Sequence, residues 1–281
     1  MITEENMLDL MYITNDSEAA LIAESAGVNR IFVDMEYMGK EARQKGLDTV
    51  KNHHTVRDVK NLRKVLTDAL LLVRVNPLHH HSKSEIDEVI AAGADIVMLP
   101  MWKSAEEVKT FIDLVGGRAK TMLLLETSQA MECVEDIVKL DGVDEIHIGL
   151  NDLRLSLGRH FIFEPLADGT VEHIVDRIKK SGIPYGFGGF GMPGEGILPA
   201  DLIIAEHYRL GSSMAILSRS FCDLREYGDN REKIKERFDY GISKLRKYEE
   251  FLARQNTSFF EMQHTKTQKR VQEIVAGGHF V

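Results

Sequence analysis

Short apolar runs alternate with longer amphipathic segments along most of the chain. A short run that is apolar at most positions is typical of a buried strand, and a longer segment with apolar residues at helical spacing predicts a helix. Eight apolar runs predict strands at residues 8–13, 30–33, 70–73, 95–99, 121–125, 143–148, 185–188 and 213–217. Amphipathic segments predict helices at residues 17–26, 55–66, 83–92, 105–115, 130–139, 170–180, 199–209 and 231–253. Helix-starting residues at four of them are Asn15 or Asp16, Ser82, Ser104 and Asp168.

This repeated strand–helix unit predicts an α/β fold. Eight consecutive units are typical of a (β/α)8 TIM barrel. An open, doubly wound sheet is the alternative, because a count of strands does not show whether the sheet closes. We expect a barrel over residues 1–228 and a C-terminal helical extension over residues 229–281. The polar tail from residue 254 is expected to pack on the barrel or on a neighbouring subunit, or to form a mobile end.

Composition and charge narrow the classes of function. The 281 residues are 43% hydrophobic and 28% charged, which is enough for a full core. A formal net charge of −9 gives no general attraction to nucleic acid or to anionic lipid. No run approaches the roughly 18 apolar residues of a membrane span. The N-terminus, MITEENMLDL, is acidic where a signal peptide would be basic. Two cysteines, Cys133 and Cys222, are too few for a disulfide framework. We therefore expect a cytoplasmic protein that binds neither nucleic acid nor membranes.

The residues that end or follow the predicted strands, most of them polar, lie where a barrel builds its active site. They are Asp34 and Glu36 after the second strand, Arg74 at the end of the third, Pro100 after the fourth, Glu126 after the fifth, and Asn151 and Asp152 after the sixth. Glu126 and Asp152 end adjacent strands, so their carboxylates repel each other unless a divalent cation or a shared proton lies between them. We interpret Gly149 as the residue that lets the backbone turn tightly before Asp152.

Two of these residues also have ordinary structural interpretations. Asp152 could be the N-cap of the next helix. Arg74 could be an ion-pair partner of Asp34 or Glu36, although a guanidinium at a barrel mouth also suits the bidentate binding of a carboxylate.

Several motifs resemble the HpcH/HpaI aldolase and citrate lyase beta family. They are DMEY, LVRVNP, AGADIVMLPMWKSAEEV, LLLETSQAMECVEDIVKLDGVDEIHIGLNDLRLSLG and GILPADLIIAEHYRLGSS, and the resemblance covers about residues 8–222. It implies a metal-dependent lyase or aldolase of 2-oxo acids or acyl-CoA esters. Glu126 and Asp152 would be the protein ligands of Mg²⁺ or Mn²⁺, and Arg74 would stabilise an enolate oxygen. Pro100 and the backbone amides around Asn151 and Asp152 would contact the substrate, and the resemblance also implies a homo-oligomer.

The chain departs from the sugar-acid aldolases of that family at two positions. Tyr37 stands where those aldolases carry a histidine that takes part in proton transfer, and Leu124 stands where they usually carry a polar residue. His53 or His54, in the long polar connection over residues 35–54, could replace that base, with Asp34 or Glu36 holding the imidazole. A solvent-exposed loop pair is an equally good interpretation of these two histidines.

Three further motifs carry weaker signals. GFGGFG, residues 186–191, has the spacing of a dinucleotide-binding loop, but no helix is predicted directly after it, so we interpret it as a rim loop. His79, His80 and His81 are consecutive and cannot all face one metal ion on regular structure. Arg219 follows the last strand, where it could contact a substrate phosphate or only neutralise the rim.

The sequence favours a metal-dependent carbon–carbon lyase or aldolase that acts on a small 2-oxo acid through a pyruvate-type enolate, with an aldehyde as a further candidate substrate. One alternative is an acyl-CoA lyase of the citrate lyase beta type. Another is a barrel that binds a 2-oxo acid without catalysis, which the missing histidine at Tyr37 favours.

Overall fold

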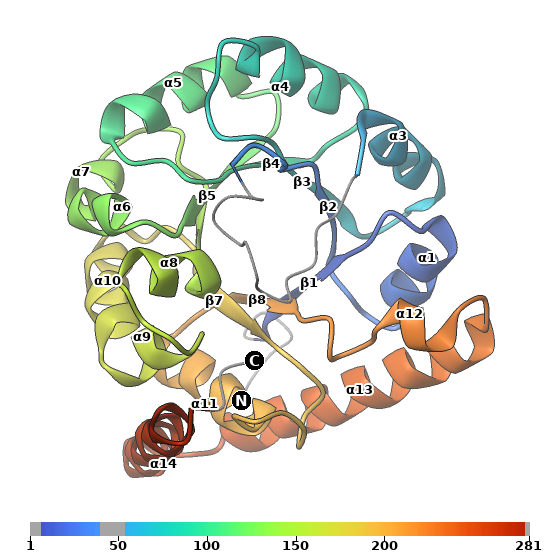
Figure 1. Cartoon of the computed structure of the whole chain (residues 1–281). Coiled ribbons are helices and arrows are strands. Elements are labelled where there is room, and N and C mark those ends of the chain that lie inside the picture. The colour runs from blue at the N-terminus through green and yellow to red at the C-terminus, as the bar shows by residue number, and fades with distance from the viewer. Residues whose placement is uncertain (1–6, 40–53, 279–281) are drawn as a thin grey trace.

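The eight strands form one closed parallel barrel. A computed structural model describes residues 7–39 and 54–278. Each strand pairs with the next, and β8 pairs with β1 (Figure 1). The strands are β1 (Asp9–Ile13), β2 (Arg30–Asp34), β3 (Leu70–Arg74), β4 (Ile96–Leu99), β5 (Lys120–Leu125), β6 (Glu145–Ile148), β7 (Tyr185–Phe190) and β8 (Met214–Leu217). The predicted (β/α)8 barrel is confirmed, and the doubly wound alternative is excluded.

The helices surround the barrel (Figure 1). They are α1 (Ser17–Ser25), α3 (Val56–Val65), α4 (Ser82–Ala91), α5 (Ala105–Val115), α6 (Ser128–Glu132), α7 (Val134–Ile137), α8 (Leu150–Ser156), α9 (Glu164–Ala167), α10 (Thr170–Ile178), the 3₁₀ helix η2 (Lys179–Ser181), α11 (Ala200–Leu210), α12 (Leu224–Tyr227), α13 (Arg231–Leu252) and α14 (Thr257–Ala276). The helix expected at residues 130–139 is divided into α6 and α7 at Cys133, whose φ of −98° and ψ of 10° leave the helical region. None of the described helices is long and apolar enough to cross a membrane.

Helix starts follow the predicted side chains at two of the four positions. Asp16 caps α1 and Ser104 caps α5, each by accepting hydrogen bonds from amides of the first turn. Ser82 is instead the first residue of α4, and Asp168 precedes the actual N-cap of α10, Gly169. Asp168 still accepts the N–H of Thr170, the first residue of α10, whereas Ser82 accepts the N–H of His79 in the turn before α4.

The segment expected as a polar tail is mostly helix α14. Its buried side chains, Thr267, Val271 and Ile274, are spaced four and three residues apart, so they lie on one face. This narrow stripe in a polar segment gives a weak sequence signal. The helix packs against α11 and α9 of its own chain (Figure 1), where Gln268 Nε2 donates to the carbonyl of Ala167 at 3.1 Å.

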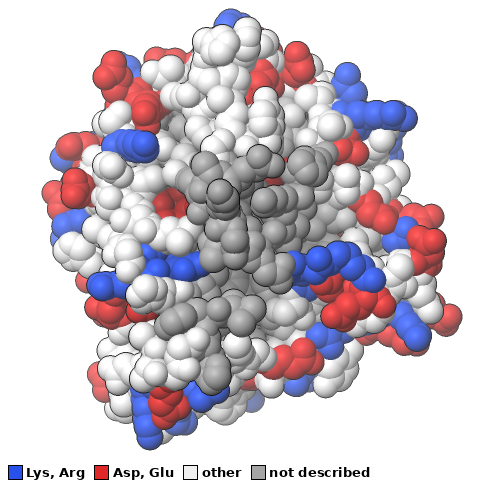
Figure 2. Space-filling view, in the orientation of Figure 1, with Lys and Arg blue, Asp and Glu red and all other residues white. Residues whose placement is uncertain are grey.

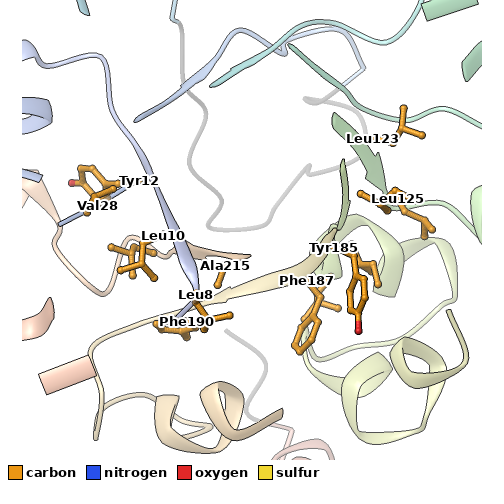
Figure 3. Close-up of a cluster of buried hydrophobic side chains, with 14 of the residues drawn as sticks. Leu8, Leu10, Tyr12, Val28, Leu123, Leu125, Tyr185, Phe187, Phe190 and Ala215 are labelled. Carbon is orange, nitrogen blue, oxygen red and sulfur yellow. The ribbon is translucent and has the colours of Figure 1, made fainter. Parts of the chain in front are cut away.

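Alternate residues of each strand point away from the barrel axis and pack beneath the helices. This outer layer is the larger hydrophobic core, and Figure 3 shows part of it. The labelled residues in that view are Leu8, Leu10, Tyr12, Val28, Leu123, Leu125, Tyr185, Phe187, Phe190 and Ala215. Burial of this layer fixes which strand faces point outward, and therefore which side chains enter the barrel.

The remaining alternate residues fill the barrel interior. Its apolar part is a separate cluster made of Met11, Phe32, Leu72, Ile96, Met98, Met122, Leu124 and Met214. In β2, Arg30, Phe32 and Asp34 are two residues apart and so follow the interior from one end to the other. At the amino end, Arg30 forms a buried ion pair with Glu145 and a second ion pair, at 2.6 Å, with the partly exposed Asp9. Asp34 reaches the carboxyl end, where the candidate site lies.

The GFGGFG segment is largely strand β7, which corrects its interpretation as a rim loop. A Cβ added at Gly186 would overlap the carbonyl oxygen of Met214, and one added at Gly189 would lie 2.7 Å from that of Ile216. These glycines therefore let β7 approach β8 closely. The pairing shifts register between them, as in a β-bulge. His147, from β6, bonds to the carbonyl oxygen of Gly188 in this irregular stretch at 3.0 Å.

The buried imidazole of His207 predicts a loss of stability in acid. It lies on α11, stacks on Phe187 with ring centroids 3.9 Å apart, and bonds through Nδ1 to Ser212 Oγ at 2.8 Å. Burial, with a smaller contribution from His147, lowers the pKa of His207 to about 3. A histidine in the unfolded chain has a pKa of about 6.5. Between about pH 3 and 6.5, the unfolded chain therefore binds a proton at this residue that the native state does not bind.

The free energy of unfolding should therefore fall as the pH falls below about 6.5, by up to about 1.4 kcal/mol per pH unit for this residue. We expect His207→Gln, which keeps a polar side chain but does not titrate, to flatten that slope in urea unfolding between about pH 6.5 and 4.5. Parallel pH profiles for the wild type and the variant would contradict this account.

Candidate active site

A buried guanidinium lies at the carboxyl end of the barrel. Arg74 ends β3 and lies above Phe32, with Cζ 5.6 Å from the ring centroid. Its Nε donates to Asp34 Oδ1 at 2.8 Å, and its Nη1 is 3.4 Å from Glu36 Oε2. Burial alone lowers the pKa of Arg74, but the charges of Asp34 and Glu36, and more weakly Glu126, raise it above its ordinary value. Arg74 therefore stays positively charged. The predicted ion pairs of Arg74 with Asp34 and Glu36 are confirmed.

The backbone after β2 bends so that consecutive amides point toward buried side chains. The amide of Glu36 donates to Asp34 Oδ1 at 3.3 Å. The amides of Tyr37 and Met38 both donate to Asn76 Oδ1 at 3.0 Å. Glu36 is buried, whereas the side chain of Tyr37 is 65% exposed. The residue at position 37 is thus largely in solvent and not beside Arg74.

Glu126 and Asp152 form a second acidic group at this end of the barrel. Glu126 follows β5, Asp152 lies in the first turn of α8, and both are buried. Burial raises the pKa of Glu126 well above its ordinary value, and the charge of Asp152 raises it further, while Arg74 opposes the shift. The carboxylate of Glu126 is therefore costly to keep charged unless a further positive group joins it.

Backbone groups on both sides define the position of the Glu126 carboxylate. Met101, after β4, donates its N–H to Glu126 Oε1 at 3.1 Å. Its φ of +56° makes it the one non-glycine residue in the left-handed region among residues 7–39 and 54–278. A Cβ added at Gly149 would lie 2.9 Å from Glu126 Oε2. Gly149 itself has an ordinary φ of −82°, so it provides room for the acid and does not serve as the tight turn we expected.

The donor set fits a divalent cation. Four buried carboxylates, on Asp34, Glu36, Glu126 and Asp152, lie at the end of the barrel that holds Arg74, and the oxygen atoms of carboxylates are the ligands that Mg²⁺ and Mn²⁺ prefer. Within the described part of the chain, no three His, Cys, Asp or Glu side chains form a ready-made metal cage. Two carboxylates with open positions for water and substrate are compatible with that finding. Charged side chains of both signs are interspersed around the margin of the face in Figure 2, so local groups must provide any selectivity for charge.

A model of the HpcH/HpaI aldolase/citrate lyase family matches residues 10–183. The chain belongs to the HpcH/HpaI aldolase/citrate lyase family. This assignment agrees with the resemblance found in the sequence motifs. The family contains aldolases and lyases and is generally dependent on a divalent metal. A comparison of the sequence with curated proteins found no match.

Several solved structures share the fold at low sequence identity. An HpcH/HpaI aldolase from Desulfitobacterium hafniense DCB-2 is 17% identical, with a TM-score of 0.59 over 82% of this chain and 94% of that one. An HpcH/HpaI aldolase/citrate lyase family protein from Burkholderia cenocepacia J2315 is 16% identical, with a TM-score of 0.62 over 83% and 95%. The citrate synthase SbnG is 17% identical, with a TM-score of 0.56 over 87% and 96%. These likenesses support the fold and do not identify a substrate.

The two expected substrate contacts flank the acids. Pro100 is buried directly after β4 and precedes Met101, whose amide bonds to Glu126. Asn151 lies beside Asp152 in the first turn of α8, and its Oδ1 accepts a hydrogen bond from Arg154 at 3.3 Å. Both residues therefore lie at the rim as expected.

The contacts of His54 and His79 differ from those that the sequence predicted. His53 lies outside the described residues. His54 Nδ1 accepts the backbone N–H of Asp34 at 3.0 Å, so the peptide, and not a carboxylate, makes this contact with the ring. His79 bonds through Nε2 to Glu85 at 3.1 Å, while its Nδ1 accepts the N–H of His81. Both ring nitrogens of His79 are thus engaged in structural hydrogen bonds.

Two residues that shape the site, Asn76 and Met101, were not among the residues that the sequence predicted there. Asn76 follows Arg74 by two positions in RVNP, so its placement on the same side of the extended chain was a readable signal. Met101 acts through its backbone, for which the sequence carries no code.

Removing the positive charge of Arg74 should be costly. In Arg74→Gln, Asp34 and Glu36 would lose a buried ion pair with this side chain, and we expect the free energy of unfolding to fall by about 3–5 kcal/mol. Urea unfolding measures it, with Lys235→Gln as the control, because the Lys235–Asp239 pair is about half exposed and is worth about 0–1 kcal/mol. Equal losses in the two variants would refute this assignment.

Proposed function

We propose that this protein is a divalent-metal-dependent carbon–carbon lyase or aldolase that acts on a small 2-oxo acid through a pyruvate-type enolate. The observation that carries the proposal is the buried pair Glu126 and Asp152, in which the charge of Asp152 disfavours that of Glu126. Such a pair is costly to keep charged without a cation, and it lies at the carboxyl end of a family barrel, where catalytic groups gather. Membership of an aldolase and lyase family supports the same class of reaction.

Glu126 and Asp152 would hold Mg²⁺ or Mn²⁺ in this proposal. When bound, the ion supplies positive charge that polarises the 2-oxo acid and stabilises the enolate. The Met101 amide holds Glu126 Oε1, and Gly149 leaves room beside Oε2. The protein thus keeps one carboxylate oxygen fixed and the other close to the segment that leads to Asp152.

Arg74 would stabilise the enolate oxygen as a hydrogen-bond donor and not as an acid. Its pKa lies above the ordinary value because Asp34 and Glu36 face it, so it does not release a proton. A preorganised cation of this kind stabilises negative charge that develops during bond cleavage. Asp34 and Glu36 hold the guanidinium in place through Nε and Nη1.

We assign the remaining contacts to the rim. The amides around Asn151 and Asp152 would bind the substrate carboxylate at the first turn of α8, and Pro100 would bound the pocket on the β4 side. His54 is the proposed proton carrier, and its ring lies against the backbone of Asp34. Because Nδ1 of His54 accepts the Asp34 amide, the neutral ring carries its proton on Nε2.

A second candidate is a barrel that binds a 2-oxo acid without turnover. The exposure of Tyr37 favours it, since this position supplies a histidine in the sugar-acid aldolases that the chain resembles. The acyl-CoA lyase alternative has no comparable observation in its favour among the described residues.

Deuterium exchange into the methyl group of pyruvate distinguishes these candidates. With Mn²⁺, the wild type should exchange the methyl protons in D₂O, and Asp152→Ala should abolish the exchange because the ion loses a ligand. One-dimensional NMR measures the rate, with Asp136→Ala, an exposed acid on α7, as the control. Exchange that is independent of metal or of Asp152 would overturn the proposed enolate chemistry. Mn²⁺ binding by calorimetry without exchange would support the non-catalytic alternative.

Gly149→Ala tests the position of the carboxylate. The new methyl group would lie 2.9 Å from Glu126 Oε2 and displace it. We expect Mn²⁺ affinity, measured by calorimetry, to fall by about 10- to 100-fold, as when a supporting contact of a metal ligand is lost. Thermal unfolding of the same sample shows whether the barrel is intact, and unchanged affinity in a folded variant would refute this placement.

A further inference from the structure

A chain of partly buried hydrogen bonds connects helix α4 to the segment that carries Glu36. At its centre is Asn76, in the connection between β3 and α4, with only 3% of its surface exposed. Its Oδ1 accepts the amides of Tyr37 and Met38, each at 3.0 Å, and its Nδ2 donates to Glu85 Oε1 at 2.7 Å. The side-chain amide cannot flip, because a flip would place NH₂ against two donors and the oxygen against a carboxylate.

Glu85 anchors this amide to α4. Its Oε1 accepts the Nδ2 of Asn76, and its Oε2 is bonded to Nε2 of His79 at 3.1 Å. Because Nδ1 of His79 already accepts the amide of His81, the neutral ring must carry its proton on Nε2 and donate it to Glu85. Each of the two oxygens of Glu85 therefore has a donor of its own.

The same amides determine where Glu36 lies. Three consecutive N–H groups are bound, that of Glu36 by Asp34 and those of Tyr37 and Met38 by Asn76. This arrangement leaves the side chain of Glu36 buried against Nη1 of Arg74. Asp34 reaches Arg74 directly from β2, whereas Glu36 depends on the conformation of the segment that Asn76 holds.

We propose that Asn76, supported by Glu85 and His79, is a positioning residue that fixes Glu36 on Arg74 and thereby sets the orientation of the guanidinium. The role in catalysis rests on the proposed function, since it concerns the arginine that would face the enolate oxygen. The positioning itself is a property of the fold. It acts on one of the two ion pairs of Arg74 and leaves Glu126 and Asp152 untouched.

Paired substitutions at positions 76 and 85 test the proposal. Asn76→Ala removes the anchor, and Asn76→Asp keeps the acceptor for the two amides but places a carboxylate against Glu85. Glu85→Gln cannot accept from both Asn76 and His79, because its NH₂ group must face one of these donors. In the double variant N76D/E85Q, the glutamine NH₂ donates to the carboxylate introduced at position 76 and its oxygen accepts from His79. Only the longer bond from the backbone of residue 76 is then lost.

Each single variant should lower the rate of metal-dependent pyruvate exchange at saturating substrate by about 10- to 100-fold, as expected for a misplaced catalytic group. The Mn²⁺ dissociation constant should not change. The double variant should recover most of the rate, and the control Lys83→Ala, an exposed residue of the same helix, should match the wild type. Unchanged rates in folded variants, or a parallel loss of Mn²⁺ affinity, would overturn the proposal.

A second measurement does not depend on catalysis. ¹⁵N NMR follows rotation of the Arg74 Nη groups, with the signals assigned by their absence in Arg74→Lys. Asn76→Ala and Glu85→Gln should speed this rotation, and the double variant should restore it. If the wild type shows no exchange, the proposed function fails, and this measurement alone decides the positioning role: unchanged rotation in the variants overturns it.

Discussion

The site depends on the ion pairs that the guanidinium of Arg74 forms with Asp34 and Glu36. A charge in this position is tolerated only because Asp34 and Glu36 meet it within the barrel mouth. That requirement draws the ends of β2 and β3 together and fixes the segment that follows β2. It also commits two of the four rim carboxylates to a structural partner.

The other two carboxylates, on Glu126 and Asp152, repel each other, and this repulsion favours the binding of a cation between them. Glu126 and Asp152 lie at the ends of neighbouring strands, and the shared edge of a parallel barrel brings them together. The Met101 amide holds Glu126 in place, and the absence of a side chain at Gly149 leaves room for it, without adding a full positive charge. A buried acid pair that the backbone positions in this way is suited to a divalent cation.

The two ends of the barrel interior differ in the balance of their buried charges. At the amino end, Arg30 is enclosed by Glu145 and Asp9, and the apolar interior separates this group from the rim. At the carboxyl end, the buried acids outnumber the arginine among the described residues. The strand alternation that places Arg30, Phe32 and Asp34 on one side of β2 accounts for both ends with one rule.

The sequence by itself determined the eight strands, the longer helices of the barrel and the family, because alternation of apolar and polar residues is a local signal and strand-end motifs are short. It also identified Asp34, Arg74, Glu126 and Asp152 as neighbours, since one barrel edge collects the residues that follow the strands. Helices α8, α9 and α12 were not predicted because they are only four to seven residues long, and α14 was not predicted because its apolar stripe is sparse.

Only the tertiary structure decided how these residues act. The room beside Gly149, the left-handed backbone of Met101 and the contact between Asn76 and the amides of Tyr37 and Met38 join segments far apart in the chain. Their geometry arises from packing between strands, and packing between distant segments leaves no periodic trace in the sequence. Residue types at strand ends reveal which chemistry is available, but the fold alone determines which charges pair with one another and which are placed to meet a ligand.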